Sequence, residues 1–148
     1  MGYTTEFRGQ WVLNKKLDDD TFNLLVGLAS TRRMKRNIQG YGVEGEFYHK
    51  DDGDFGQERT PDIIDYNQPP KTQPSLWLRW VPTEDRMGIE WDGGEKFYGY
   101  VEWIQYLISA ILAPRGYVLN GQVQWRGEEW DDMGTIFIEN NVIAIPSN

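Results

Sequence analysis

The chain has no cysteine and a single histidine, His49, among its 148 residues. Without cysteine it can form neither a disulfide bond nor a thiolate metal site, and this composition is typical of proteins from a reducing compartment. A lone histidine excludes hydrolases that need a histidine pair and zinc sites that use several histidines. We therefore expect no metal ion and no cofactor.

Long apolar segments are also missing. No apolar run approaches about 18 residues without a polar interruption, and the opening MGYTTEFRGQW lacks the charged and apolar regions of a signal peptide. The expected location is the cytoplasm, without contact with a membrane. A length of 148 residues is typical of one domain and is sufficient to bury a hydrophobic core.

Positive charge is scarce, with 15 Lys and Arg against 23 Asp and Glu and a net charge of −8. So acidic a chain repels the phosphate backbone, which argues against bulk nucleic-acid binding. Residues 1–41 nevertheless hold seven basic and four acidic side chains, whereas residues 42–66 hold two and eight. The positive charge is concentrated in TRRMKR, residues 31–36.

Hydrophobic periodicity predicts the secondary structure. Apolar residues alternate over 7–13, as in a strand, and then recur at helical spacing after the capping aspartates 18–20. The cationic run 31–36 should end this helix, so that both ends complement its dipole. The remaining expected elements are a hairpin of 76–81 with 87–91, a helix over 95–112, a strand over 117–126, and a hairpin of 135–139 with 142–145 turning at Asn140-Asn141.

This order of elements predicts an α+β fold. We expect an antiparallel sheet with both helices packed on one face, in a ferredoxin-like βαββαβ order with an extra C-terminal hairpin. The chain should form a single domain, residues 1–148, with a long acidic loop rich in Gly, Asp and Pro at residues 40–74.

The segment DDGDFGQE, residues 51–58, contains the triplet Asp54-Phe55-Gly56 that protein kinases use to hold magnesium. The other kinase motifs do not occur in the chain, and a calcium loop beginning at Asp52 would place Gly56 and Ile63 where oxygen ligands are needed. A looser cation site remains an alternative. We interpret the segment as an acidic turn whose aspartates bond to their own backbone.

Motifs of nucleophilic and phosphate chemistry are absent, since neither Gly-x-Ser-x-Gly nor a Walker A loop occurs. Acid/base catalysis by carboxylates stays open as an alternative, because several acidic side chains could converge in a cleft. The candidates are Asp54, Glu58, Asp65, Glu90, Asp92 and Glu102.

Arginines and aromatic rings offer the material for a ligand site. The arginines of the basic run present planar forks that grip phosphate or carboxylate, although they would equally serve as solvated surface next to a helix end. Rings are abundant around the first hairpin, where segment 76–81 places them on both faces of a strand, so that a loop, a partner or a stacked ligand must cover one face. These rings are Trp77, Trp80, Trp91, Tyr98 and Trp103.

Several segments carry a family resemblance: GDFGQ at 53–57, DYNQPP at 65–70, QPSLWLRWVP at 73–82, WDGGEKFYGYVEWIQYLI at 91–108, LAPRGYVLNGQVQWRGEEWDDMG at 112–134 and TRRMKR at 31–36. Together they resemble an uncharacterised family of small bacterial and phage-associated proteins that has no assigned activity. The resemblance implies a self-contained domain from a bacterium or its phage, and it brings no catalytic or binding residues.

From these observations we predict a non-catalytic protein that binds a small anionic molecule, best a nucleotide derivative, and that could sequester a nucleotide immune signal of the host. Arginines would neutralise the anion, aromatic rings would stack on it, and amide and carboxylate groups would read its polar edges. The predicted ligand-binding residues are Arg32, Arg33, Arg36, Asp54, Gln57, Asn67, Trp77, Trp91, Asp92, Tyr98 and Trp103.

Two other functions remain open. One is a protein-interaction module whose acidic loop, residues 42–66, engages a basic partner by charge steering. The other is a phosphoester or nucleotide hydrolase that uses carboxylate acid/base groups. The surplus of aromatic surface also suggests a homodimer.

Overall fold

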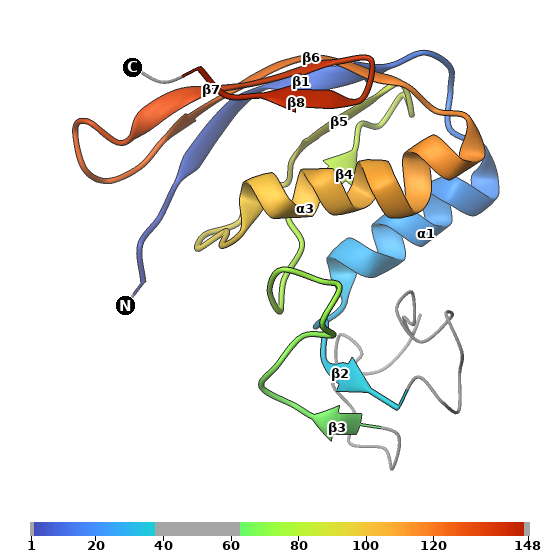
Figure 1. Cartoon of the computed structure of the whole chain (residues 1–148), viewed down its shortest axis with the longest axis vertical. Coiled ribbons are helices and arrows are strands. Elements are labelled where there is room, and N and C mark those ends of the chain that lie inside the picture. The colour runs from blue at the N-terminus through green and yellow to red at the C-terminus, as the bar shows by residue number, and fades with distance from the viewer. Residues whose placement is uncertain (1, 38–62, 147–148) are drawn as a thin grey trace.

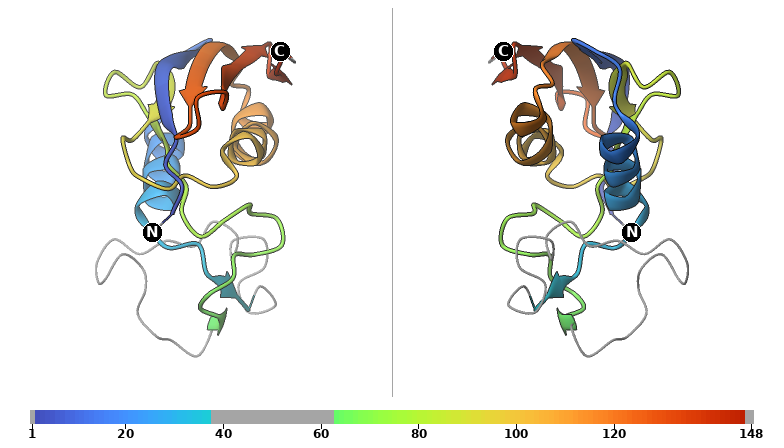
Figure 2. Two further views of the ribbon diagram at one scale, coloured as in Figure 1. Left: turned by 90° about the vertical axis from the view of Figure 1, so that its left-hand side faces the viewer. Right: turned by 90° about the vertical axis from the view of Figure 1, so that its right-hand side faces the viewer.

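A computed structural model describes residues 2–37 and 63–146. The main sheet has six antiparallel strands in the order β4-β5-β1-β6-β7-β8, and both helices lie on one of its faces (Figures 1 and 2). The elements are β1 Glu6–Leu13, α1 Asp19–Ser30, β2 Lys35–Arg36, β3 Ile63–Asp65, β4 Trp80–Pro82, β5 Gly88–Trp91, α3 Tyr100–Tyr106, β6 Leu119–Arg126, β7 Met133–Glu139 and β8 Val142–Ala144. The predicted α+β class is therefore confirmed.

The sheet order separates strands that are joined through a helix. The connection from β1 through α1 to β4 leaves β5 between the two strands, and the connection from β5 through α3 to β6 leaves β1 between them. The C-terminal hairpin of β7 and β8 extends the sheet beyond β6. None of the helices among residues 2–37 and 63–146 is long and apolar enough to cross a membrane.

A small second sheet of β2 and β3 lies beyond the helices, away from the main sheet (Figure 1). Backbone hydrogen bonds attach its first strand to the later chain, from Arg33 N–H to the Leu76 carbonyl at 2.7 Å and from Lys35 N–H to the Gln68 carbonyl at 2.7 Å. The segment DDGDFGQE and the predicted loop as far as residue 62 lie outside the described residues.

The core lies between the inner face of the sheet and the two helices, and tryptophans fill much of it. Trp11, Trp80 and Trp103 are completely buried. Phe7 and Trp11 meet the Trp80 ring edge-on at centroid distances of 4.9 and 4.7 Å. Edge-to-face pairs of this kind stabilise a fold beyond the burial of their area.

Two helix boundaries differ from the sequence prediction. Helix α1 ends at Ser30 with no basic residue in its last turn, because Thr31 already has extended backbone; the cationic run does not cap it, and that prediction is wrong. Helix α3 begins only at Tyr100, after Gly99 with a left-handed φ of 67°, and continues as the π-helical turn Leu107–Leu112 and the 3-10 turn Ala113–Arg115. Residues 95–98 are therefore loop.

The N-cap of α1 gives a testable pH effect. Asp18 accepts a hydrogen bond from Thr21 N–H at 2.7 Å, and this bond lowers the pKa of the Asp18 carboxyl below its ordinary value of 3.8. Because the pKa is depressed in the folded state, the stabilisation is complete above the unfolded pKa and is lost as the pH falls through the folded pKa. In urea unfolding at stepped pH, Asp18→Asn, which keeps a neutral capping oxygen, should lose stability less steeply on acidification.

Asp20→Asn is the matched control, since Asp20 lies in the same first turn without capping it. It should keep the wild-type steepness. Equal steepness in Asp18→Asn and the wild type would show that the cap is not ionised in the way the geometry indicates.

Candidate functional site

A hollow of about 430 Å³ lies between the segment that leads into β4 and the loop between β5 and α3. We call it the ring pocket, because two partly exposed aromatic side chains form much of its wall. Its volume falls within the range of small-molecule sites, about 300 to 1,000 Å³. The lining residues are Pro69, Ser75, Leu76, Trp77, Arg79, Glu95, Lys96 and Tyr98.

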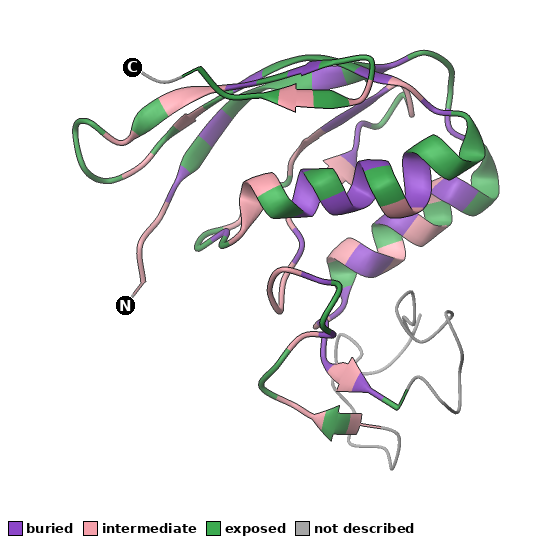
Figure 3. Cartoon of the chain, viewed as in Figure 1, coloured by how far each residue is buried: buried purple, intermediate pink, exposed green. Residues whose placement is uncertain are grey.

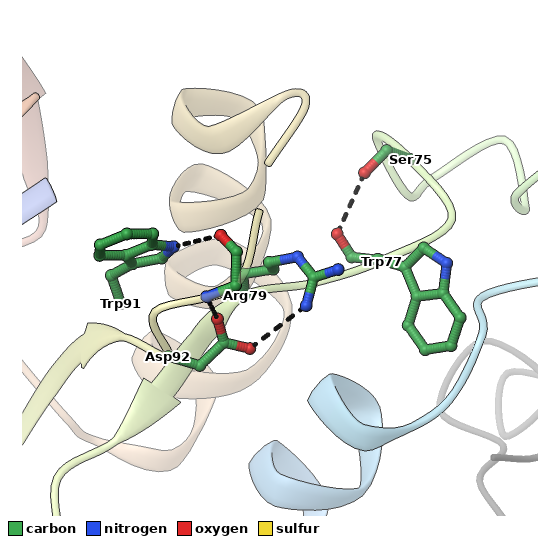
Figure 4. Close-up of polar contacts among 6 residues, drawn as sticks. Ser75, Trp77, Arg79, Trp91 and Asp92 are labelled. Carbon is green, nitrogen blue, oxygen red and sulfur yellow. Dashed lines mark hydrogen bonds and ion pairs between the residues drawn. The ribbon is translucent and has the colours of Figure 1, made fainter. Parts of the chain in front are cut away.

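The loop wall of the ring pocket is folded back on itself by hydrogen bonds to Gly94. Trp91 Nε1 donates to the Gly94 carbonyl at 3.1 Å, and Gly94 N–H donates to the Asp92 carboxylate at 2.7 Å (Figure 4). The fold-back needs left-handed backbone, with φ of 85° at Gly93 and 60° at Lys96. Left-handed backbone at a non-glycine residue such as Lys96 is strained, and it persists only where the surrounding structure fixes that conformation.

The opposite wall is fixed through one hydroxyl group. Ser75 Oγ accepts from Trp103 Nε1 at 2.7 Å and lies 3.1 Å from the Tyr98 carbonyl, to which it donates. It also lies 3.3 Å from the Trp77 carbonyl (Figure 4). One hydroxyl, itself bonded to the buried Trp103, thus lies against the backbone carbonyls of both residues that carry the pocket's rings.

Arg79 supplies a cation to the ring pocket. Its Nη1 lies 3.7 Å from an Asp92 carboxylate oxygen, in a long ion pair whose side chains are about one-quarter exposed (Figure 4). Its Nε is buried and has no hydrogen-bond partner, the one such side-chain atom in the part of the chain that the structure describes. Buried polar groups are nearly always satisfied, so this guanidinium is short of acceptors, and its exposed part lies in a residue that lines the pocket, where it can donate to a ligand oxyanion.

The aromatic wall is open to solvent. Tyr98 is 52% exposed and Trp77 is partly exposed. The Trp77 indole N–H has no partner within the described ranges. Lys96 adds a second cation and Glu95 one carboxylate. The pocket can therefore stack a flat ring and hold an anionic group.

The predicted arginines do not line this pocket. Arg33 is only 2% exposed; its Nε donates to Gln73 Oε1 at 3.2 Å and its Nη1 to Thr31 Oγ1 at 2.7 Å. Burial lowers the pKa of Arg33 to about 10. Arg36 is also buried. Both side chains thus lie inside the protein, apart from the ring pocket.

Arg32 pairs with its neighbours in the β2–β3 region. Its Nη2 donates to Asn67 Oδ1 at 3.3 Å, its Nε to the Tyr66 carbonyl at 3.2 Å, and its guanidinium lies 4.8 Å from the Tyr66 ring centroid. Arg32 and Asn67 therefore lie together, but neither lines the ring pocket.

Four other predicted residues gather at or next to the pocket, and one belongs to the core. Trp77 and Tyr98 line it, Asp92 pairs with its arginine, and Trp91 bonds its loop while packing edge-on against Phe7 at 5.5 Å. Trp103 is fully buried and so does not present its ring to a ligand. Asp54 and Gln57 lie outside the described residues.

The carboxylates of the hydrolase alternative are dispersed where the structure shows them. Asp65 lies in β3, Glu90 in β5 and Glu102 in α3, while Asp92 pairs with Arg79. In residues 2–37 and 63–146 no group of three or more His, Cys, Asp or Glu side chains could hold a metal ion.

The chain was compared with known protein families, curated proteins and solved structures. No family model, no curated protein and no solved structure matches the chain. The site is therefore interpreted from its own geometry. Neither Arg79 nor Lys96 is among the residues predicted from the sequence, although Arg79 stands between two tryptophans in LWLRWV, residues 76–81, which marks it as a candidate.

Proposed function

We propose that this protein binds a flat, anionic small molecule in the ring pocket without converting it. The observation that carries the proposal is the partly exposed Arg79, whose guanidinium has one N–H without a partner and which lines the same hollow as Trp77 and Tyr98. Desolvated guanidinium groups bind oxyanions through short, charge-assisted hydrogen bonds. Neighbouring rings give a second, charge-independent contact.

The charges of the pocket favour a ligand of low negative charge. Asp92 neutralises part of the positive charge of Arg79, and the negative charge of Glu95 offsets the positive charge of Lys96 in the pocket lining. A nucleotide derivative suits this balance, because its base can stack on Trp77 or Tyr98 while its phosphate meets Arg79 and Lys96. The narrower proposal, sequestration of a nucleotide immune signal, rests on the family resemblance of the sequence.

The proposal is tested by calorimetric titration with adenosine 5′-monophosphate and with adenosine. The wild type should bind the monophosphate more tightly, and Arg79→Gln should weaken that binding by about tenfold or more, because a hydrogen bond to a charged group is lost. Tyr98→Ala should weaken binding of both compounds, since it removes a ring that is half exposed and outside the core. The compound recovered after incubation should be unchanged.

Arg115→Gln is the control, because Arg115 lies beyond the far end of the α3 helix, where its Nη1 donates to the Ile111 carbonyl at 3.1 Å, and it does not line the ring pocket. It should leave both affinities unchanged. If neither adenosine 5′-monophosphate nor adenosine binds, or if Arg79→Gln and Tyr98→Ala bind as the wild type does, the ring pocket is not the site of a nucleotide. Recovery of a hydrolysed compound would favour the enzymatic alternative.

A further inference from the structure

A second hollow, of about 380 Å³, lies across β1, β6 and β7. Buried and exposed residues follow one another along these strands (Figure 3). The buried set, Phe7, Trp11, Leu119 and Val123 among them, belongs to the core, so the residues between them belong to the other face of the sheet. We call this the sheet-face hollow; it shares no residue with the ring pocket. It is lined by Glu6, Arg8, Gln124, Trp125, Arg126, Met133, Gly134 and Thr135.

Strand register brings two arginines together on the exposed face. Arg8 lies directly across from Gln124, and Arg126 lies directly across from Glu6. Arg8 and Arg126 are therefore diagonal neighbours on the same face, at a separation of about 7 to 8 Å that long side chains readily bridge. Thr135 lies across from Gln124 on the next strand, so a hydroxyl and an amide stand beside the two guanidinium groups.

Neither guanidinium is engaged by residues 2–37 or 63–146. Arg8 and Arg126 have no hydrogen bond or ion pair in the described part of the chain, although Glu6 lies across from Arg126. In a chain of net charge −8, two unpaired arginines on one face form a local positive site. The planar forks of both can grip the oxygens of one anion simultaneously.

We propose that the sheet-face hollow binds the phosphate group of a small phosphate ester between Arg8 and Arg126. Gln124 and Thr135 add neutral donors to the oxygens, whereas Glu6 weakens binding by like-charge repulsion. The proposal is independent of the function of the ring pocket, because the two hollows have no residue in common.

The test follows the arginine side-chain Nε–Hε signals of ¹⁵N-labelled protein during titration with phenyl phosphate. The signals of Arg8 and Arg126 should shift with saturation, and Arg8→Gln or Arg126→Gln should each weaken binding by about tenfold or more. Glu6→Gln should tighten it, an opposite effect that a purely structural role of this face would not produce. Arg79→Gln should leave this binding unchanged and so separates the two sites.

Melting temperatures near that of the wild type will establish that these exposed substitutions leave the fold intact. Unchanged affinity in both arginine variants, or signals that shift without saturation, would overturn the site. Benzoate is the second probe, and binding as tight as that of phenyl phosphate would show that the hollow takes carboxylates, which contradicts the phosphate assignment. Weaker binding in Glu6→Gln would contradict the assigned role of that carboxylate.

Discussion

Replacing Trp80 by alanine is expected to lower the free energy of unfolding by about 3 to 5 kcal/mol, the largest effect among the substitutions considered. The Trp80 side chain is completely buried at the start of β4. Its ring meets those of Phe7, Trp11 and Phe97 at centroid distances of 4.9, 4.7 and 5.1 Å. Removing it leaves a cavity that these rings, fixed on β1 and next to α3, can fill only in part.

The indole also connects sheet and helix. Trp80 Nε1 donates to the carbonyl of Tyr100, the first residue of α3, at 2.8 Å. Trp80→Phe keeps most of the ring volume and loses this bond, so it should cost less than the alanine substitution. Urea unfolding followed by far-UV circular dichroism measures both; a loss below about 1 kcal/mol for Trp80→Ala would show that the ring is not central to the core.

Replacing Gly134 by valine is the second large effect, with an expected loss of about 1 to 3 kcal/mol from overpacking. Gly134 of β7 lies directly across from Trp125 of β6, and the indole covers the glycine so closely that any Cβ there would overlap its six-membered ring. The ring therefore has to move. Tertiary contacts around it oppose that movement.

Displacing the Trp125 ring should also loosen the N-terminal segment. Trp125 Nε1 donates to Asp132 at 3.1 Å, and the same carboxylate accepts from the Tyr3 hydroxyl at 2.6 Å. In Gly134→Val we expect faster amide exchange at residues 3–5 and 127–132 as well as lower stability. Gly93→Asn, at a loop position with open space around its Cβ and a left-handed φ that asparagine tolerates, should not change exchange there. Unchanged exchange in Gly134→Val would mean that the ring relaxes without breaking its bonds.

Most secondary structure followed from local patterns. Strict alternation predicted β1 and β6, and the Asn140-Asn141 turn between β7 and β8 has both φ values positive, 49° and 69°, as a two-residue hairpin turn requires. The start of α3 did not follow, because FYGY at 97–100 continues the apolar pattern while Gly99 takes left-handed backbone. The spacing of apolar residues therefore predicts that a helix is present, but it does not specify the residue at which the helix begins.

The site was predicted only in part, for a similar reason. Trp77, Tyr98 and Asp92 were selected from an excess of rings and polar groups near the first hairpin, and they lie at the ring pocket. Arg33 was selected for its charge, yet hydrogen bonds to Thr31 and Gln73 hold it inside the protein. Arg79 was not selected, because a single arginine in a strand pattern is usually exposed.

The amino-acid sequence by itself determined the α+β class, the succession of strands and helices, and the positions of several turns, since these depend on the spacing of apolar residues and on turn residues close together in the chain. Only the tertiary structure decided which charges are open. Pairing of β1 with β6 brings Arg8 to Arg126, and the pairing of β4 with β5, continued by the bond from Asp92 N–H to the Arg79 carbonyl, brings Asp92 to Arg79. Such neighbours depend on contacts between distant segments, whose register no local pattern specifies.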